Sequence, residues 1–142
     1  MERLSFPRVM LFLAGALCAA GLLTGCTTAS PDIRQESGIV GVWDTGTGTL
    51  TYTPDGDFSF ERRDSEDSVE GTYIVERSGD FWVEKTTYLR QVIGGTIYEE
   101  DDGGRELPEY IFLSEGDAIR WWETVEDARS GEAPVNEGTR MR

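Results

Sequence analysis

The chain has 142 residues with 27 acidic and 13 basic side chains, a net charge of −14 at pH 7, and no histidine. The missing histidine removes the side chain most often used for proton transfer near neutral pH, and with it the commonest transition-metal ligand. The acidic excess opposes binding to nucleic acid phosphates and to anionic lipid headgroups, so we expect neither as a partner.

The first 25 residues contain the three zones of a secretory signal in the required order. Arg3 and Arg8 make the start weakly positive, and residues 9–23 follow as an apolar run without charge. Leu23-Thr24-Gly25-Cys26 then resembles the lipobox of bacterial lipoproteins. That resemblance implies cleavage before Cys26, a diacylglyceryl group on its thiol and a further acyl chain on its freed amine.

Two other interpretations of this segment are an uncleaved membrane helix and the signal of a soluble secreted protein. The apolar run of 15 residues, 9–23, is shorter than the roughly 20 that a spanning helix needs. A soluble signal would leave the lipobox a coincidence, so we expect a protein anchored to the cell envelope, where two or more acyl chains hold stably. Thr27 stands where an aspartate would signal retention at the inner membrane in enteric bacteria, which favours the outer membrane, facing the periplasm or the cell surface.

The chain has two cysteines, and neither would remain as a thiol in the mature domain. Cys18 leaves with the signal, and Cys26 is consumed by lipid. The domain would therefore have no disulfide, although its compartment permits one. Together with the absent histidine, this excludes Cys–His and Ser–His–Asp catalysis and ordinary structural zinc sites. We expect no enzyme.

The rest of the chain divides into three parts by composition. Residues 26–37 are polar and contain Pro31, which predicts a flexible tether after the lipidated cysteine. Residues 38–126 consist of short alternating runs separated by turn residues, the pattern of antiparallel β structure. Residues 127–142 are polar without alternation, and we predict a disordered tail.

Turn signals divide the β region into strands. Leu50 and Tyr52 precede Thr53-Pro54-Asp55-Gly56, where proline and glycine favour a turn. Further strands are predicted at 69–76, 81–93, 96–99, 110–113 and 118–124. Alternation puts Phe81 and Val83 on the inward face. We predict an all-β fold, a small antiparallel up-and-down barrel of seven or eight short strands, because closure removes the edges of a small sheet without disulfides. Its aromatic core would comprise Trp43, Tyr52, Phe58, Phe60, Tyr73, Phe81, Tyr110, Phe112 and Trp121.

Gly41-Val42-Trp43 resembles the Gly-x-Trp that closes one end of lipocalin barrels. Gly71-Thr72-Tyr73 and residues 112–121 then follow in the order of the small lipocalin-like domains found in many bacterial lipoproteins. The resemblance covers about residues 39–124 and implies a barrel that binds a small apolar ligand. It also implies an arginine from a late strand packed over Trp43, for which Arg120 is the candidate. The domain is shorter than a full lipocalin and lacks its second and third signature motifs and its terminal helix.

The other candidate binding residues are Trp82 and Trp122. Each stands beside a neighbour assigned to the inward face, so each is a candidate for an exposed aromatic contact surface. The alternative is an ordinary packing role at a barrel end or in a cross-strand pair. Trp43 has the same two interpretations, a signature residue or a plain core tryptophan.

Four consecutive acids, Glu99-Glu100-Asp101-Asp102, precede two glycines. A calcium site needs six to eight oxygens converging from a shaped loop, and this run lacks the alternating spacing of known calcium loops. Nothing places two carboxylates across a cleft, as glycoside cleavage requires. We interpret the run as a solvated loop and expect no metal and no cofactor.

Two functions remain. The first is a non-catalytic, lipid-anchored binding module that holds a small apolar ligand in a lipocalin-like barrel. The second is an envelope interaction protein with a packed barrel, which binds a protein or glycan through surface aromatic residues. The barrel interior separates them, since the first needs an open lumen and the second does not.

Overall fold

The computed structural model describes residues 32–101 and 106–142. The signal segment, Cys26 and the tether up to residue 31 lie outside the described residues, so the lipobox interpretation stays a prediction. Among the described residues, nine strands and two short helices follow in this order: α1 (Ile33–Ser37), β1 (Gly41–Asp44), β2 (Gly48–Tyr52), β3 (Asp57–Arg62), β4 (Ser68–Ser78), β5 (Phe81–Ile93), β6 (Thr96–Asp101), β7 (Glu109–Glu115), β8 (Ala118–Trp122), α2 (Val125–Ser130) and β9 (Asn136–Arg140).

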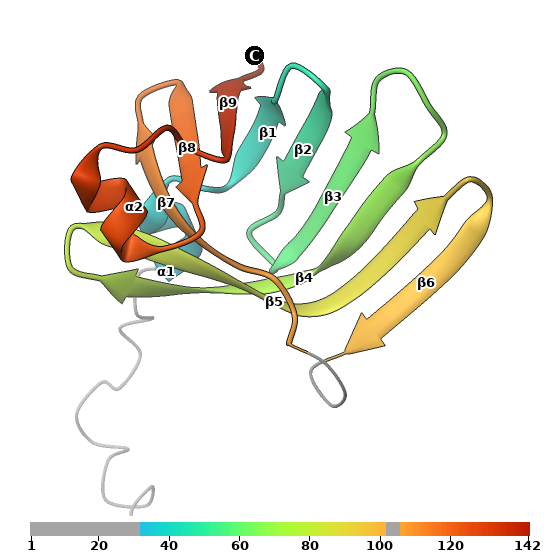
Figure 1. The fold of residues 1–142 in the computed structure, drawn as a ribbon, viewed down its shortest axis with the longest axis horizontal. Coiled ribbons are helices and arrows are strands. Elements are labelled where there is room, and N and C mark those ends of the chain that lie inside the picture. The colour runs from blue at the N-terminus through green and yellow to red at the C-terminus, as the bar shows by residue number, and fades with distance from the viewer. Residues whose placement is uncertain (1–31, 102–105) are drawn as a thin grey trace, which may run out of the picture. The chain divides into compact units, whose positions relative to one another are not determined.

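Eight of these strands form a closed antiparallel barrel. The hydrogen-bonded order is β4-β3-β2-β1-β9-β8-β7-β5, and β5 pairs with β4 to complete the ring. The predicted all-β, small antiparallel barrel is therefore confirmed. Strand β6 pairs with β5 outside the ring and extends from the barrel as the second arm of a hairpin (Figure 1).

In the long β4–β5 hairpin, strand β5 pairs with two different strands on its other edge. The first half of β5 pairs with β7, from Trp82 opposite Phe112 to Lys85 opposite Glu109. Its second half pairs with β6. The register against β4 shifts between these halves, because Thr72 lies opposite Tyr88 while Tyr73 lies opposite Thr86. Thr87 is thus the extra residue of a β-bulge, which bends the strand and changes which side chains face inward.

The prediction of a disordered tail at 127–142 is wrong. Helix α2 begins after Thr124, whose side chain accepts a hydrogen bond from the Asp127 N–H, and ends at Gly131, which has a left-handed backbone. Strand β9 follows and pairs with both β8 and β1, so this segment closes the barrel.

The alternation of apolar residues does not predict strand β9, because its inward position is a glycine. Gly138 is its one buried residue, and a Cβ there would lie 3.1 Å from Ile119 Cγ2 and 3.2 Å from Trp43 Cβ. The strand therefore approaches the core with bare backbone, and no apolar side chain marks it in the sequence.

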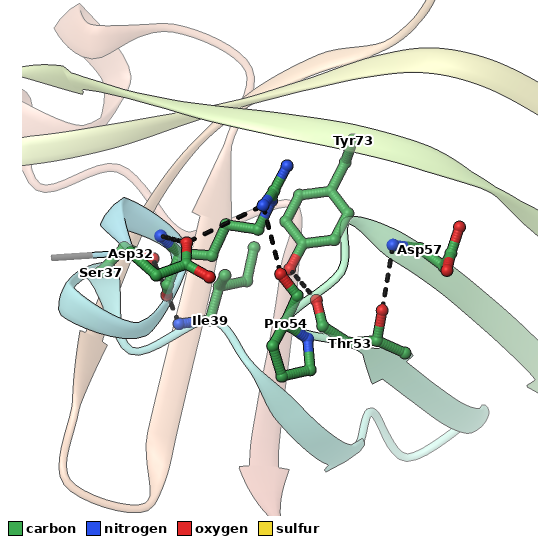
Figure 2. A network of polar contacts seen from close by, with 8 residues as sticks. Asp32, Ser37, Ile39, Thr53, Pro54, Asp57 and Tyr73 are labelled. Atoms are coloured by element: carbon green, nitrogen blue, oxygen red, sulfur yellow. Dashed lines mark hydrogen bonds and ion pairs between the residues drawn. The ribbon is translucent and has the colours of Figure 1, made fainter. Parts of the chain in front are cut away.

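The predicted tether also differs from the structure at its end. Residues 33–37, predicted as part of the tether, form the five-residue helix α1, and Asp32 is its N-cap. Arg34 of this helix donates to the Pro54 carbonyl at 3.2 Å, and its guanidinium carbon lies 5.6 Å from the centroid of the Tyr73 ring. Tyr73 Oη donates to the Thr53 carbonyl at 2.8 Å (Figure 2). The helix is thereby fixed against the turn before β3.

Apolar side chains pack on both faces of the sheet. The main core lies inside the barrel and includes Trp43, Tyr73, Phe112 and Trp121. A second group, the outer cluster, consists of Val83, Ile111 and Trp122, with Val125 and Ala128 of α2 packed against it. The assignment of Phe81 and Val83 to the inward face is therefore wrong, because α2 covers the outer face and makes it apolar as well.

Candidate functional site: the barrel pocket

The interior of the barrel contains a pocket of about 580 Å³. Its deeper wall is apolar and aromatic and comprises the buried side chains Leu50, Tyr52, Phe58, Leu89 and Trp121. Exposed residues such as Thr47, Glu123, Val135 and Asn136 line it near the surface. A volume of this size lies within the range of about 300–1,000 Å³ typical of small-molecule sites.

A buried carboxyl group is the main polar feature of the pocket. Glu84 lies on β5 and is only 4% exposed. Tyr52 Oη from β2 donates a hydrogen bond of 2.8 Å to Glu84 Oε2. Side chains two residues apart on a strand lie on the same face. Trp82 and Thr86 both face the barrel interior, so Glu84 between them faces it as well.

Burial raises the pKa of Glu84 from 4.5 to about 7, because the charged form is poorly solvated in the barrel. The hydrogen bond from Tyr52 and the nearby indole N–H of Trp121 oppose this shift without cancelling it. Glu84 thus exchanges its proton near neutral pH. Burial, followed by the charge of Glu84, in turn raises the pKa of Tyr52 well above its ordinary value, so Tyr52 stays a donor.

The Trp121 indole nitrogen is a buried donor in the pocket without a hydrogen-bond partner. Trp121 is 3% exposed and lines the same pocket. Its Nε1–H is near enough to Glu84 to lower the pKa of that carboxyl, yet it makes no hydrogen bond of acceptable geometry. An unpaired buried donor costs about 1–3 kcal/mol, so this position favours a ligand atom or a shifted carboxylate that accepts from it.

The β-bulge at Thr87 determines the remainder of the β5 wall. Before it the inward positions are Glu84 and Thr86, and after it they are Leu89 and Gln91, which also line the pocket. The extra residue therefore directs an apolar side chain inward where an unbroken alternation would have turned Tyr88 and Arg90 inward. This keeps a cationic side chain out of the pocket.

The charged residues that line the pocket are both acidic. They are Glu84 and Glu123, and no lysine or arginine stands among the described lining residues. Tyr110 lies opposite Glu84 on β7. Burial is the largest cause of its raised pKa, followed by the charges of Glu84 and Glu123. The interior therefore repels anions and lacks a countercharge for its own buried carboxyl.

Trp43 is a core tryptophan in the structure, and the arginine that lies over it is not the predicted one. Trp43 is fully buried, and its Nε1–H donates to the Ile39 carbonyl at 2.8 Å. Arg140 of β9 lies over its ring, with the guanidinium carbon 4.2 Å from the ring centroid, and donates to the carbonyls of Val40 and Gly38. The assignment of Arg120 to this role is wrong.

Arg120 lies on the surface instead. It forms an ion pair with Glu115 at 2.8 Å, and its guanidinium carbon is 5.9 Å from the centroid of the Trp122 ring. The correct arginine was missed because Arg140 lies in the segment interpreted as a tail. Trp43, Arg120 and the pocket do not come together as one site.

The two tryptophans proposed as an exposed contact surface are covered to different degrees. Trp122 is 5% exposed, belongs to the outer cluster and donates from Nε1 to the Glu132 carbonyl at 3.0 Å. Trp82 is half-buried against the main core, and Arg77 lies 5.1 Å from its ring centroid. Neither tryptophan is an exposed aromatic side chain in this fold.

The acidic run at residues 99–102 lies partly in β6, with Asp102 outside the described residues. Glu99 accepts from Tyr88 Oη at 3.2 Å and forms an ion pair with Arg90 at 3.6 Å. Within residues 32–101 and 106–142 no group of three or more His, Cys, Asp or Glu side chains is arranged to hold a metal ion. In that same part of the chain no helix is long and apolar enough to cross a membrane.

The residue that sequence reasoning missed is Glu84. The signal was present as Trp82-x-Glu84-x-Thr86, an alternation of the same period as the other strands. Assigning Phe81 and Val83 inward gave that strand the opposite face and put Glu84 on the surface. The pocket and the buried carboxyl define a class of protein, a small closed β-barrel with a buried carboxyl group inside a largely aromatic and aliphatic lumen.

Comparison of the chain with protein-family models, with curated proteins and with solved structures gives no match. Its function therefore has to be argued from the site.

Proposed function

We propose that this chain is a lipid-anchored, non-catalytic binding protein of the bacterial cell envelope that holds a small, largely apolar ligand in its barrel pocket. The observation that supports the proposal most is the pocket of about 580 Å³ with its aromatic and aliphatic wall. Apolar walls with a few placed polar groups are typical of sites that bind small molecules.

The anchor part of the proposal depends on the lipobox. Leu23-Thr24-Gly25-Cys26 fits all four positions of that motif, and the preceding 15-residue run has the length of a signal rather than of a spanning helix. Lipid on Cys26 would hold the barrel at a membrane, with the outer membrane favoured by Thr27. The net negative charge keeps the barrel surface away from anionic headgroups.

The alternative is a packed barrel that binds an envelope protein or a glycan through surface aromatic side chains. Two observations make it the weaker candidate. The barrel interior is hollow enough to form a pocket, and the tryptophans proposed for the surface are buried in one case and half-buried in the other.

Uptake of a hydrophobic fluorescent dye by the chain from Thr27 onward tests the binding function. This chain includes the whole barrel and its core, which lie within residues 32–142. We expect saturable dye binding, which Leu89→Trp abolishes because the larger ring fills the pocket. Ile74→Trp is the matched control, since Ile74 is 40% exposed on β4 and should leave uptake unchanged.

Native mass spectrometry of the same chain provides a second measurement, in which a co-purified apolar molecule supports the proposal. A bare mass together with no dye uptake by the folded chain contradicts it. The anchor has its own test: Cys26→Ala should leave an unprocessed precursor without lipid label, and a mature labelled product from that variant would refute lipidation at Cys26.

A further inference from the structure

The acceptor and donor groups inside the pocket restrict what its ligand can be. Every charged group that lines it is acidic among the described residues, and the deeper of the two, Glu84, is 4% exposed. A buried carboxylate without a countercharge is strongly unfavourable unless a cation reaches it. No described lining residue of the pocket supplies that cation.

The groups that face Glu84 come from several strands, and none of them is a cation. They are Tyr52 of β2, Tyr73 of β4, Tyr110 of β7, Trp121 of β8 and, more distantly, Glu123 after β8. Arg34, which acts on the pKa of Tyr73, contacts the Tyr73 ring and the Pro54 carbonyl. It does not reach Glu84 as an ion-pair partner.

The wall around the carboxyl is aromatic. Tyr52, Phe58 and Trp121 line the pocket together with Phe60 and Tyr110. The negative faces of aromatic rings attract organic cations, and this attraction strengthens when the cation is desolvated. An aromatic wall with one carboxyl at its interior is therefore complementary to an ammonium group attached to an apolar body.

We propose that the ligand of this pocket is a protonated organic amine with an apolar body, whose ammonium group pairs with Glu84 while its hydrocarbon part lies against the aromatic wall. This inference rests on the proposed binding function and names the chemical class that the function requires. The unpaired Trp121 N–H then donates either to the ionised carboxylate or to an oxygen next to the amine. The acidic surface of the protein attracts such a cation and repels fatty acids of the same length.

Binding and proton release are coupled in this arrangement. At pH 6 the Glu84 carboxyl, with its pKa near 7, is largely protonated, so an incoming ammonium must displace that proton. Above pH 7 the carboxylate is already charged. Amine affinity should therefore rise between pH 6 and pH 8, while the affinity of a neutral ligand of the same shape should change little.

The test uses three probes with one carbon skeleton, octylamine, octanol and octanoate, titrated calorimetrically below their micelle concentrations into the chain from Thr27 onward. We expect octylamine to bind at least about tenfold more tightly than octanol at pH 8, a difference that equals one carboxylate–ammonium pair of ordinary strength. Octanoate should bind weakest. The preference for the amine should shrink at pH 6.

Glu84→Gln is the decisive variant, because the amide keeps the shape and can still accept from Tyr52. It should remove the amine preference and its pH dependence while leaving octanol affinity unchanged. Glu61→Gln is the matched control and should keep the preference, since Glu61 is an exposed carboxylate of β3 that does not line the pocket. A Glu84→Gln chain that still prefers octylamine would show that the preference arises elsewhere.

The failures of the two proposals are distinguishable. If octanol or octanoate binds as tightly as octylamine, the amine inference is overturned and the binding pocket stands. If none of the three probes binds and the dye is not taken up, the binding function itself fails. If octanol binds more tightly than octylamine in both the parent chain and Glu84→Gln, the amine inference is overturned and the pocket is a plain apolar site.

Discussion

Trp121 and Trp122 are neighbours on one strand, and they belong to two regions with different chemistry. Both are almost fully buried, at 3% and 5% exposure. The N–H of Trp122 is bonded to the Glu132 carbonyl in the outer cluster, whereas that of Trp121 is unpaired in the lumen. Burial alone does not separate a structural tryptophan from one at a site.

The same contrast extends to the residues beside them. The outer cluster consists of apolar side chains closed by α2, and its tryptophan donor is satisfied. The lumen contains a buried carboxyl of raised pKa, an unpaired donor and open volume. Of the two unpaired buried donors among the described residues, Arg34 Nε lies in α1 and Trp121 Nε1 borders the pocket, where a ligand can complete it.

The largest effect should come from removing the tryptophan of the closed region. Trp122→Ala should lower the free energy of unfolding by about 3–5 kcal/mol, because it leaves a cavity under α2 and unpairs the Glu132 carbonyl. Trp121→Ala should cost less, since its ring already borders open volume. Denaturant unfolding of both variants measures the difference, and equal losses would show that the two regions are packed alike.

The next effect concerns the carboxyl in the lumen. Folding raises the pKa of Glu84 from 4.5 to about 7, so between these pH values the folded chain keeps a proton that the unfolded chain has lost. Stability from this group is therefore complete below pH 4.5 and is lost as pH rises through 7. At pH 8, Glu84→Gln should be more stable than the parent chain by about 3 kcal/mol.

The pH dependence of that difference identifies its source. Near pH 5 the two chains should differ little, because the Glu84 carboxyl is protonated in the fold. Thermal unfolding from pH 5 to pH 8 follows the change, with Glu123→Gln as an exposed control that should follow the parent. A Glu84→Gln chain less stable than the parent at pH 8 would contradict the raised pKa.

The smallest effect compares the two indole donors directly. Trp122→Phe should cost about 1–2 kcal/mol, since it removes a hydrogen bond and leaves the Glu132 carbonyl without its donor. Near pH 5, where the Glu84 carboxyl is protonated, Trp121→Phe removes a donor that has no hydrogen-bond partner and should be neutral or slightly stabilising. Chemical denaturation measures the change in the free energy of unfolding for both variants. Changes of opposite sign would support the distinction between the two regions, and a larger loss of stability in Trp121→Phe would contradict it.

The parts of the fold that the sequence predicts are those in which turn chemistry and alternation agree. Thr53-Pro54-Asp55-Gly56 joins β2 to β3, and Gly79 and Gly116 lie in the turns of the β4–β5 and β7–β8 hairpins with positive φ angles of 62° each. Glycine adopts that backbone without strain, so these turns can be predicted from the glycines in the sequence. The barrel class followed from the alternation between them.

The parts that were missed have inward positions that do not look apolar. Strand β9 faces the core with Gly138, and β5 faces it with Glu84. The outer cluster adds a second apolar face, which makes alternation ambiguous on β5, β7 and β8. Tertiary cover by α2 decides between the faces, and no local pattern contains that information.

The bulge at Thr87 also predicts how the pocket responds to a change in chain length. Deleting Thr87 would leave β5 in unbroken alternation with Leu89 and Gln91 still inward, whereas pairing the full-length strand without the bulge would turn Tyr88 and Arg90 into the lumen. The interior would then acquire a positive charge beside Glu84. A one-residue deletion is therefore tolerated at Thr87, while a slip of register at the same place is not.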